Sequence, residues 1–135
     1  QTMNKSVIMF LSAIIVIPAI VFSLAFCFSK ALKSDVSVLT SLLDETDGII
    51  TADSDNQDDI FKNLNAFNKR WEKSSERWCF FLDHESIHQV DIMTAEFESE
   101  ILNGRYASAL ITSAAIKQAL KTMSEYDTLK ISNLF

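Results

Sequence analysis

Residues 60–81 read IFKNLNAFNKRWEKSSERWCFF, and this stretch decides the fold. Its large apolar residues recur at gaps of four, three, four, seven and three, which is the period of one helix face. They are Ile60, Leu64, Phe67, Trp71, Trp78 and Phe81. The spacing predicts an amphipathic helix of roughly six turns.

Three other stretches repeat this helical spacing. Their apolar positions are Leu32, Val36, Leu39, Leu43 and Ile50 in the first, Ile87, Val90, Phe97 and Ile101 in the second, and Tyr106, Leu110, Ala114, Leu120 and Met123 in the third. Beyond residue 28 there is no proline and there are only two glycines, too few for strands joined by tight turns. We expect Gly48 and Gly104 each to close the first helix of a pair.

These patterns predict an all-α chain in which an N-terminal transmembrane helix continues into a small four-helix bundle or two tetratricopeptide-like helical hairpins. The expected helical domain spans residues 30–135. Its hairpins cover about 31–82 and 84–126, and a C-terminal tail covers 127–135. Asp83 is expected to cap the third helix.

The stretch before the bundle reads VIMFLSAIIVIPAIVFSLAFCF over residues 7–28 and contains no charged residue. At about 1.5 Å per residue, a helix of this length crosses the hydrocarbon layer of a bilayer. A cleaved signal peptide usually has a shorter apolar region and a small-x-small cleavage site, which FSLAFCFSKA lacks. We therefore expect a short tail over residues 1–6 and a retained single-pass membrane span over 7–29.

The lysines around the span and the short tail before it give opposing indications of its orientation. Lys30 and Lys33 follow the span and only Lys5 precedes it, which favours a cytoplasmic bundle. A short N-terminal tail followed by one span is, however, typical of an anchor that exports its C-terminal domain. We expect a cell-membrane protein with an extracytoplasmic helical domain. Pro18, in the middle of the span, predicts a bend or a notch for another membrane helix.

Charge excludes one class of partner. Residues 31–135 hold 10 basic and 18 acidic side chains, a formal charge of −8. A surface of this sign repels phosphate backbones, so we expect no nucleic-acid partner. Residues 44–59 contain seven acids and no base and are expected to form a solvated linker. Cys27 and Cys79 lie far apart in the chain and imply neither a disulfide framework nor a metal cluster.

The stretch His84-Glu85-Ser86-Ile87-His88 matches the H-E-x-x-H pattern of zinc proteases. On a helix, His84 and His88 share a face, and Glu85 would serve as the general base. A catalytic zinc site also needs a third protein ligand, and the chain has no third histidine. We therefore expect no metal, cofactor or catalytic residue, and a membrane-anchored zinc metallopeptidase using His84, Glu85 and His88 is the alternative.

The segment WEKSSERWCFFLDHESI (71–87) and the ending YDTLKISNLF (126–135) resemble an uncharacterised family of small single-span membrane proteins from Firmicutes, known only as a domain of unknown function. The matching positions are Trp71, Trp78, Phe81, Leu82, Asp83, His84, Ile87, Asn133, Leu134 and Phe135. This chain departs from the family pattern at Ser86 and His88, where the family usually places acids. Genes of the family often lie beside those of a multi-pass membrane protein, so the resemblance implies an accessory subunit without catalytic residues.

The function expected from the sequence is that of a non-enzymatic, membrane-anchored helical interaction module, an accessory or regulatory subunit of a membrane protein complex. Its expected partners are the lipid bilayer, a multi-pass membrane protein, and further copies of the chain. The candidate contact residues are Pro18, Trp71, Trp78, Phe80, Phe81, Leu134 and Phe135. Phe80 lies off the apolar stripe of its helix. A small extracytoplasmic ligand sensor is a second alternative.

Overall fold

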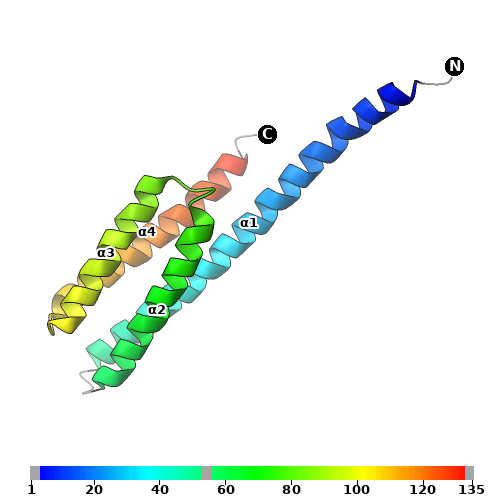
Figure 1. Ribbon diagram of the computed structural model, residues 1–135. Helices are drawn as coiled ribbons and strands as arrows, with labels where there is room; N and C mark the ends of the chain where they lie inside the picture. The colour runs from blue at the N-terminus through cyan, green and yellow to red at the C-terminus, as the bar shows by residue number, and fades with distance from the viewer. Residues whose placement is uncertain (1–3, 53–55, 133–135) are drawn as a thin grey trace.

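The computed structural model describes the backbone of residues 4–52 and 56–132, and the side chains of these ranges up to Glu125. Every regular element in these ranges is a helix: α1 (Lys5–Thr51), α2 (Gln57–Trp78), α3 (His84–Leu102) and α4 (Tyr106–Ser132). The expected all-α fold is therefore confirmed. The helices run alternately up and down and form an antiparallel bundle from which the first half of α1 projects (Figure 1).

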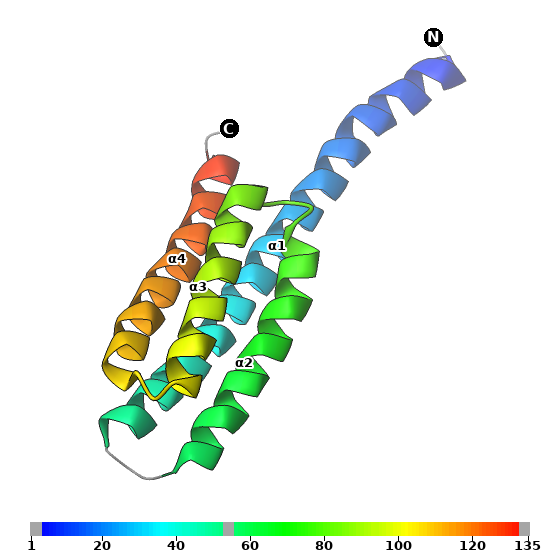
Figure 2. The same ribbon diagram turned by 60° about the vertical axis from the view of Figure 1, so that its left-hand side comes forward.

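Each helix buries one face in a shared core. The buried apolar residues are Leu32, Leu39 and Leu43 of α1, Ile60, Leu64, Phe67, Trp71 and Trp78 of α2, Ile87, Val90, Phe97 and Ile101 of α3, and Ala109, Ile116, Leu120 and Met123 of α4. Helix α1 packs against α2 and α4, and α4 packs against α3 (Figure 2). Helices α2 and α3 approach each other less closely. Because α1 also packs against α4, the two hairpins close into a bundle.

Helix α1 runs unbroken for 47 residues and has two distinct halves. In the first half, residues 5–28, every side chain from Val7 to Leu24 is exposed. We call residues 5–28 the projecting segment. The first buried residue is Leu32, so the second half belongs to the bundle. The α2–α3 connection (79–83) lies at the end of the bundle from which this segment emerges, the near end, and the α3–α4 turn (103–105) lies at the far end (Figures 1 and 2).

Several expected helix ends were wrong. Gly48 does not end α1, which continues to Thr51, and α2 begins at Gln57, so more than half of the expected linker over residues 44–59 is helical. At the other end, α1 begins at Lys5, inside the expected 1–6 tail. Helix α4 extends to Ser132, beyond residue 126. Residues 44–51 and 127–132 contain no proline, and a lone glycine costs a helix only about 1 kcal/mol, which the packing of neighbouring residues offsets.

The inner face of α4 also differs from the expected stripe. Leu110 is only half-buried and Ala114 is exposed, whereas Ala109 and Ile116 are fully buried. Apolar residues occur on all sides of α4, so their spacing does not select one face. The hydroxyl of the buried Ser113 faces α1, where it donates to Asp47 Oδ2 at 2.9 Å.

The two glycines should respond in opposite directions to substitution by alanine. Gly104 has φ +67°, a conformation in which a Cβ is strained, and it follows the end of α3 as expected. Gly48 lies inside α1, and a Cβ there would meet no atom within 4 Å. We expect Gly104→Ala to destabilise the bundle by about 1 kcal/mol and Gly48→Ala to stabilise it by about 0.5–1 kcal/mol. Thermal unfolding in detergent measures both, and a shift of the same sign for the two variants would contradict this assignment.

Candidate functional site

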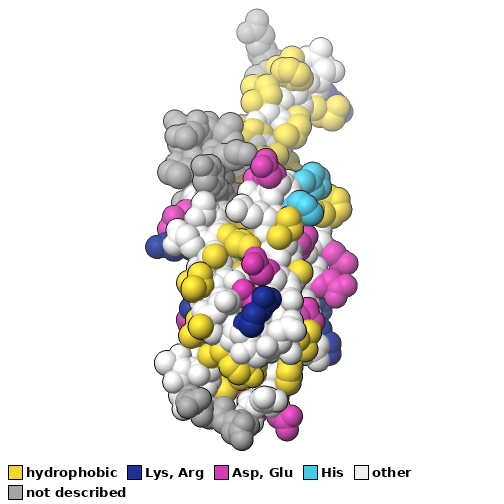
Figure 3. All heavy atoms as spheres, turned by 90° about the vertical axis from the view of Figure 1, so that its left-hand side faces the viewer, with side chains coloured by type: hydrophobic (Ala, Val, Ile, Leu, Met, Phe, Trp, Pro, Cys, Tyr) yellow, Lys and Arg dark blue, Asp and Glu magenta, His cyan; other side chains and the backbone are white. Residues whose placement is uncertain are grey.

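The H-E-x-x-H stretch lies at the start of α3, on the surface. As expected, Asp83 caps this helix: its Oδ1 accepts the backbone N–H of Ser86 at 2.8 Å, and its Oδ2 accepts the Ser86 hydroxyl at 2.8 Å. His84, Glu85 and His88 are all exposed. Figure 3 shows the two imidazoles next to each other on the outside of the bundle, close to its near end.

Within the described ranges, no third metal ligand lies beside these two histidines. Among the described residues, no group of three or more His, Cys, Asp and Glu side chains is placed to hold a metal ion. We expect elemental analysis of the purified full-length protein to find no stoichiometric zinc, because two exposed imidazoles on one turn supply only half of a tetrahedral set. Stoichiometric zinc that disappears in His88→Ala would contradict this prediction.

The two tryptophans predicted as contact candidates lie in the core. Trp71 is 4% exposed and Trp78 is 1% exposed. Their rings meet edge to face at a centroid distance of 5.6 Å. Trp71 Nε1 donates to Asp91 Oδ1 of α3 at 2.6 Å, and Trp78 Nε1 donates to Asp35 Oδ2 of α1 at 3.2 Å. Each indole therefore tethers α2 to a neighbouring helix, and neither presents a free surface to a partner.

Asp35 is a buried charge on the inner face of α1. Its side chain is 4% exposed and lies between two arginines of α2: Arg70 Nη2 contacts Oδ1 at 2.6 Å and Arg77 Nη2 contacts Oδ2 at 2.9 Å. With Trp78 as a third donor, the carboxylate is paired and hydrogen-bonded, as a buried charge requires. This group, which we call the Asp35 cluster, joins α1 to α2 near the point where α1 leaves the bundle.

Two other contact candidates are exposed at the near end. Phe80 is 84% exposed and Phe81 is 62% exposed, and both belong to the α2–α3 connection. The expected place of Phe81 on the apolar stripe of α2 was wrong, because α2 ends at Trp78 and the chain turns there. The ring of Phe81 stacks on Phe28 of α1 at a centroid distance of 4.1 Å. We call Phe28, Phe80 and Phe81 the aromatic corner.

A hollow of about 480 Å³ opens beside the aromatic corner. Its apolar lining consists of all three rings with Ala31 and Trp78, and its polar edge consists of Asp35, Glu76 and Arg77. Chemically, this site combines exposed aromatic surface with a polar edge, on which Arg77 is paired with Asp35.

The remaining contact candidates lie elsewhere. Pro18 is in the middle of the projecting segment. A shallow groove of about 410 Å³ lies on this segment, lined by Ile15, Val16, Ala19, Ile20, Ser23, Leu24 and Cys27. Leu134 and Phe135 lie outside the described residues.

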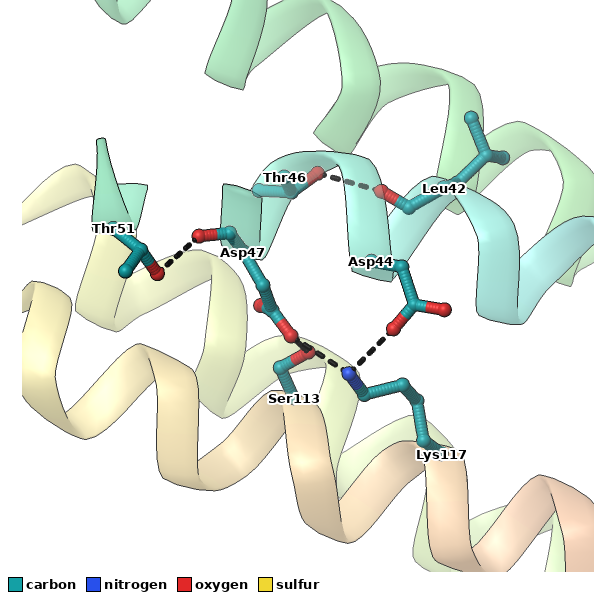
Figure 4. Close-up of polar contacts among 7 residues, drawn as sticks. All are labelled: Leu42, Asp44, Thr46, Asp47, Thr51, Ser113 and Lys117. Atoms are coloured by element: carbon teal, nitrogen blue, oxygen red, sulfur yellow. Dashed lines mark hydrogen bonds and ion pairs between the residues drawn. The ribbon is translucent and has the colours of Figure 1, made fainter. Parts of the chain in front are cut away.

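A second polar cluster joins α1 to α4 (Figure 4). Lys117 Nζ lies 2.7 Å from Asp44 Oδ1 and 2.8 Å from Asp47 Oδ2, and the latter oxygen also accepts the Ser113 hydroxyl. Burial lowers the pKa of Lys117, but the hydrogen bonds to Asp44 and Asp47 and the charges of both carboxylates outweigh it, so the pKa is raised above 10.5.

This pKa shift predicts a pH dependence of stability. A lysine whose pKa is higher in the folded state stabilises it fully below the unfolded pKa, and the contribution is lost as pH rises through the folded pKa. We expect Lys117→Met to destabilise the protein by about 1 kcal/mol at neutral pH. The gap between wild type and variant should narrow in strongly alkaline solution, where Lys117 loses its proton. Paired urea unfolding curves measure the gap, and an unchanged gap would contradict the shift.

The sequence contains evidence for the Asp35 cluster that a search for apolar residues alone does not find. Asp35 stands between Leu32 and Leu39 at helical spacing, so a charged residue occupies the buried face. Buried charges need partners, and α2 offers Arg70 and Arg77, each directly before a tryptophan. Phe28 carried no comparable signal, because its stacking on Phe81 depends on where the α2–α3 turn folds back.

The bundle corresponds to a known family. A family model described as Domain of unknown function (DUF4363) matches residues 26–134, a range that contains all the residues of the aromatic corner and both polar clusters. No significant match exists among curated proteins or among solved structures.

Proposed function

The chain belongs to the family described as Domain of unknown function (DUF4363), and we propose that it is a non-enzymatic, membrane-anchored helical module that holds or regulates a partner in the membrane. The observation that carries this proposal is the exposure of the projecting segment. Large apolar side chains from Val7 to Phe26 are between 46% and 71% exposed. Removing this surface from water gains about 25 cal/mol per Å² of apolar area, so lipid or another membrane helix is their natural surrounding.

The unbroken course of α1 supports a regulatory role. The same helix provides the apolar segment and one quarter of the bundle. The Asp35 cluster fastens it to α2, and Lys117 fastens it to α4 through Asp44 and Asp47. A rotation or tilt of α1 in the membrane would therefore move the bundle with it.

The groove on the projecting segment, whose lining does not include Pro18, supports contact with a helix of a multi-pass membrane protein. Ala19, Ser23 and Cys27 recur every four residues along it, and small residues let membrane helices approach closely. The Ser23 hydroxyl donates to the Ala19 carbonyl at 2.9 Å, so it exposes no unpaired donor to lipid. The sequence resemblance to an uncharacterised family of small single-span membrane proteins implies the same kind of partner.

We propose that the bundle lies on the extracytoplasmic side of the membrane, the side expected from the sequence. A reporter enzyme active only outside the cytoplasm, fused after Phe135, should therefore be active. An inactive reporter on a well-expressed fusion would reverse the orientation.

Affinity purification from membranes tests the proposed partner. The full-length chain, tagged after Phe135 and extracted in mild detergent, should recover a multi-pass membrane protein. Ala19→Leu, which fills the groove, should abolish recovery, whereas Val21→Phe, which adds bulk on the other side of the helix, should not. Repeated recovery of the isolated chain alone would refute the proposed partner, and equal recovery by both variants would refute the role of the groove.

A further inference from the structure

The aromatic corner is held in place by the fold, although its outer rings face away from the core. Phe80 and Phe81 are 84% and 62% exposed. The backbone N–H groups of Phe81 and Leu82 both donate to the carbonyl of Trp78, at 2.9 and 2.8 Å. This turn directs the two rings outward, and the stacking of Phe81 on Phe28 adds a side-chain contact to α1. The exposure therefore results from a defined turn, and apolar surface presented in this way marks an interaction site.

The position of Phe28 fixes the height of this corner relative to the apolar segment. Phe28 is the last residue of the apolar stretch 7–28, and the exposed Lys30 and Lys33 follow it within two turns. In a membrane-spanning helix, such a boundary lies at the edge of the hydrocarbon layer, where lysines extend toward the lipid phosphates. Because the ring of Phe81 lies 4.1 Å from that of Phe28, the corner lies at the same height.

We propose that the aromatic corner inserts into the interfacial layer of the bilayer, and that a phospholipid of that leaflet occupies the hollow beside it. This inference rests on the proposed membrane anchor. Aromatic rings concentrate at this depth of membrane proteins. The hollow of about 480 Å³ presents Phe28, Ala31 and Phe80 to an acyl chain, and its polar edge holds Arg77 together with Asp35 and Glu76. The bundle is thereby held against the membrane at two points, α1 and the corner.

The charge of the bundle indicates which force drives insertion. Residues 31–135 carry a formal charge of −8, so anionic lipids do not attract the bundle as a whole. Burial of the Phe80 and Phe81 rings is the favourable contribution, and salt does not screen it. Insertion should therefore occur in uncharged phosphatidylcholine and persist at high ionic strength.

Depth-dependent fluorescence quenching tests this proposal on the full-length chain. Single-cysteine variants are labelled with bimane and reconstituted in phosphatidylcholine liposomes containing a nitroxide-labelled phosphatidylcholine. The test position is Phe80→Cys in a Cys27→Ala, Cys79→Ser background. Serine keeps the hydrogen bond that the Cys79 thiol donates to the Glu76 carbonyl. The matched control is Leu102→Cys in the same background, because Leu102 is 63% exposed at the far end.

We expect several-fold stronger quenching at position 80 than at position 102, unchanged by added salt. The native Cys27, labelled in a Cys79→Ser variant, reports on the anchor separately. Quenching at Cys27 with equal, weak quenching at positions 80 and 102 would overturn the inference and leave the anchor standing. Absence of quenching at Cys27 would overturn both. A blue-shifted but unquenched probe at position 80 would mean that protein covers the corner, and would also overturn the inference.

Discussion

Replacing Arg70 and Arg77 together with methionine should destabilise the bundle by about 3–5 kcal/mol. The double substitution would leave the carboxylate of Asp35, whose side chain is 4% exposed, with the Trp78 indole as its remaining donor in the cluster. A buried charge that loses its ionic partners still bears the full cost of its desolvation. This effect is large against the 5–15 kcal/mol that a domain of this size has in total.

Removing the carboxylate of Asp35, in place of the two arginines, should cost less stability. Asp35→Leu leaves two arginines whose side chains are 37% and 56% exposed, so both can be hydrated, and the Trp78 N–H is the group that loses its acceptor. We expect a loss of about 1–2 kcal/mol. Adding Asp35→Leu to the double arginine variant should restore most of the lost stability, since an apolar set can replace a buried ionic one at little cost.

Urea unfolding of the full-length protein in a non-ionic detergent measures these differences, because urea leaves ion pairs unscreened whereas guanidinium salts do not. The matched control is Lys69→Met with Lys73→Met, which removes two exposed positive charges from the same helix and should change stability by less than about 0.5 kcal/mol. A larger loss for Asp35→Leu than for the double arginine variant would contradict the burial assigned to Asp35.

The features of the fold that were predictable from sequence are those fixed by local chemistry. The apolar spacing of α2 located its buried face from Ile60 to Trp78. Asp83 defined the start of α3, because a side-chain oxygen before a helix satisfies its free N–H groups. Gly104 defined the end of the same helix through a conformation that other residues rarely adopt.

The features that were missed depend on contacts between distant segments. Gly48 looked like a helix end, but packing carries α1 past it. Asp44 and Asp47 looked like part of a solvated linker, yet Lys117, some seventy residues away, pairs with both. Phe81 is exposed because the chain turns after Trp78. Phe81 follows Trp78 by three residues, which fits the helical period, so the apolar spacing did not predict that turn. Local patterns therefore identified elements, and tertiary contacts decided which residues form the candidate site.

Trp78 should be the most sensitive single position in the core. It is the largest fully buried side chain, at 1% exposure. Its ring packs edge to face on Trp71, and its N–H supports Asp35. Trp78→Ala removes the ring, the aromatic contact and the hydrogen bond together, so we expect a loss of about 3–5 kcal/mol. Trp78→Phe keeps an aromatic ring and should cost about 1–2 kcal/mol, from the lost donor and the smaller volume.

Phe80→Ala is the informative comparison, because Phe80 lies two residues from Trp78 and is also a large aromatic residue. Its ring is 84% exposed, so truncation should change the unfolding free energy in detergent by less than about 0.5 kcal/mol. Circular dichroism follows helix content during urea unfolding. It therefore gives the unfolding free energies of the Trp78 and Phe80 variants without relying on tryptophan fluorescence. A loss for Phe80→Ala equal to that for Trp78→Phe would place Phe80 in the core and remove the exposed aromatic surface on which membrane insertion depends.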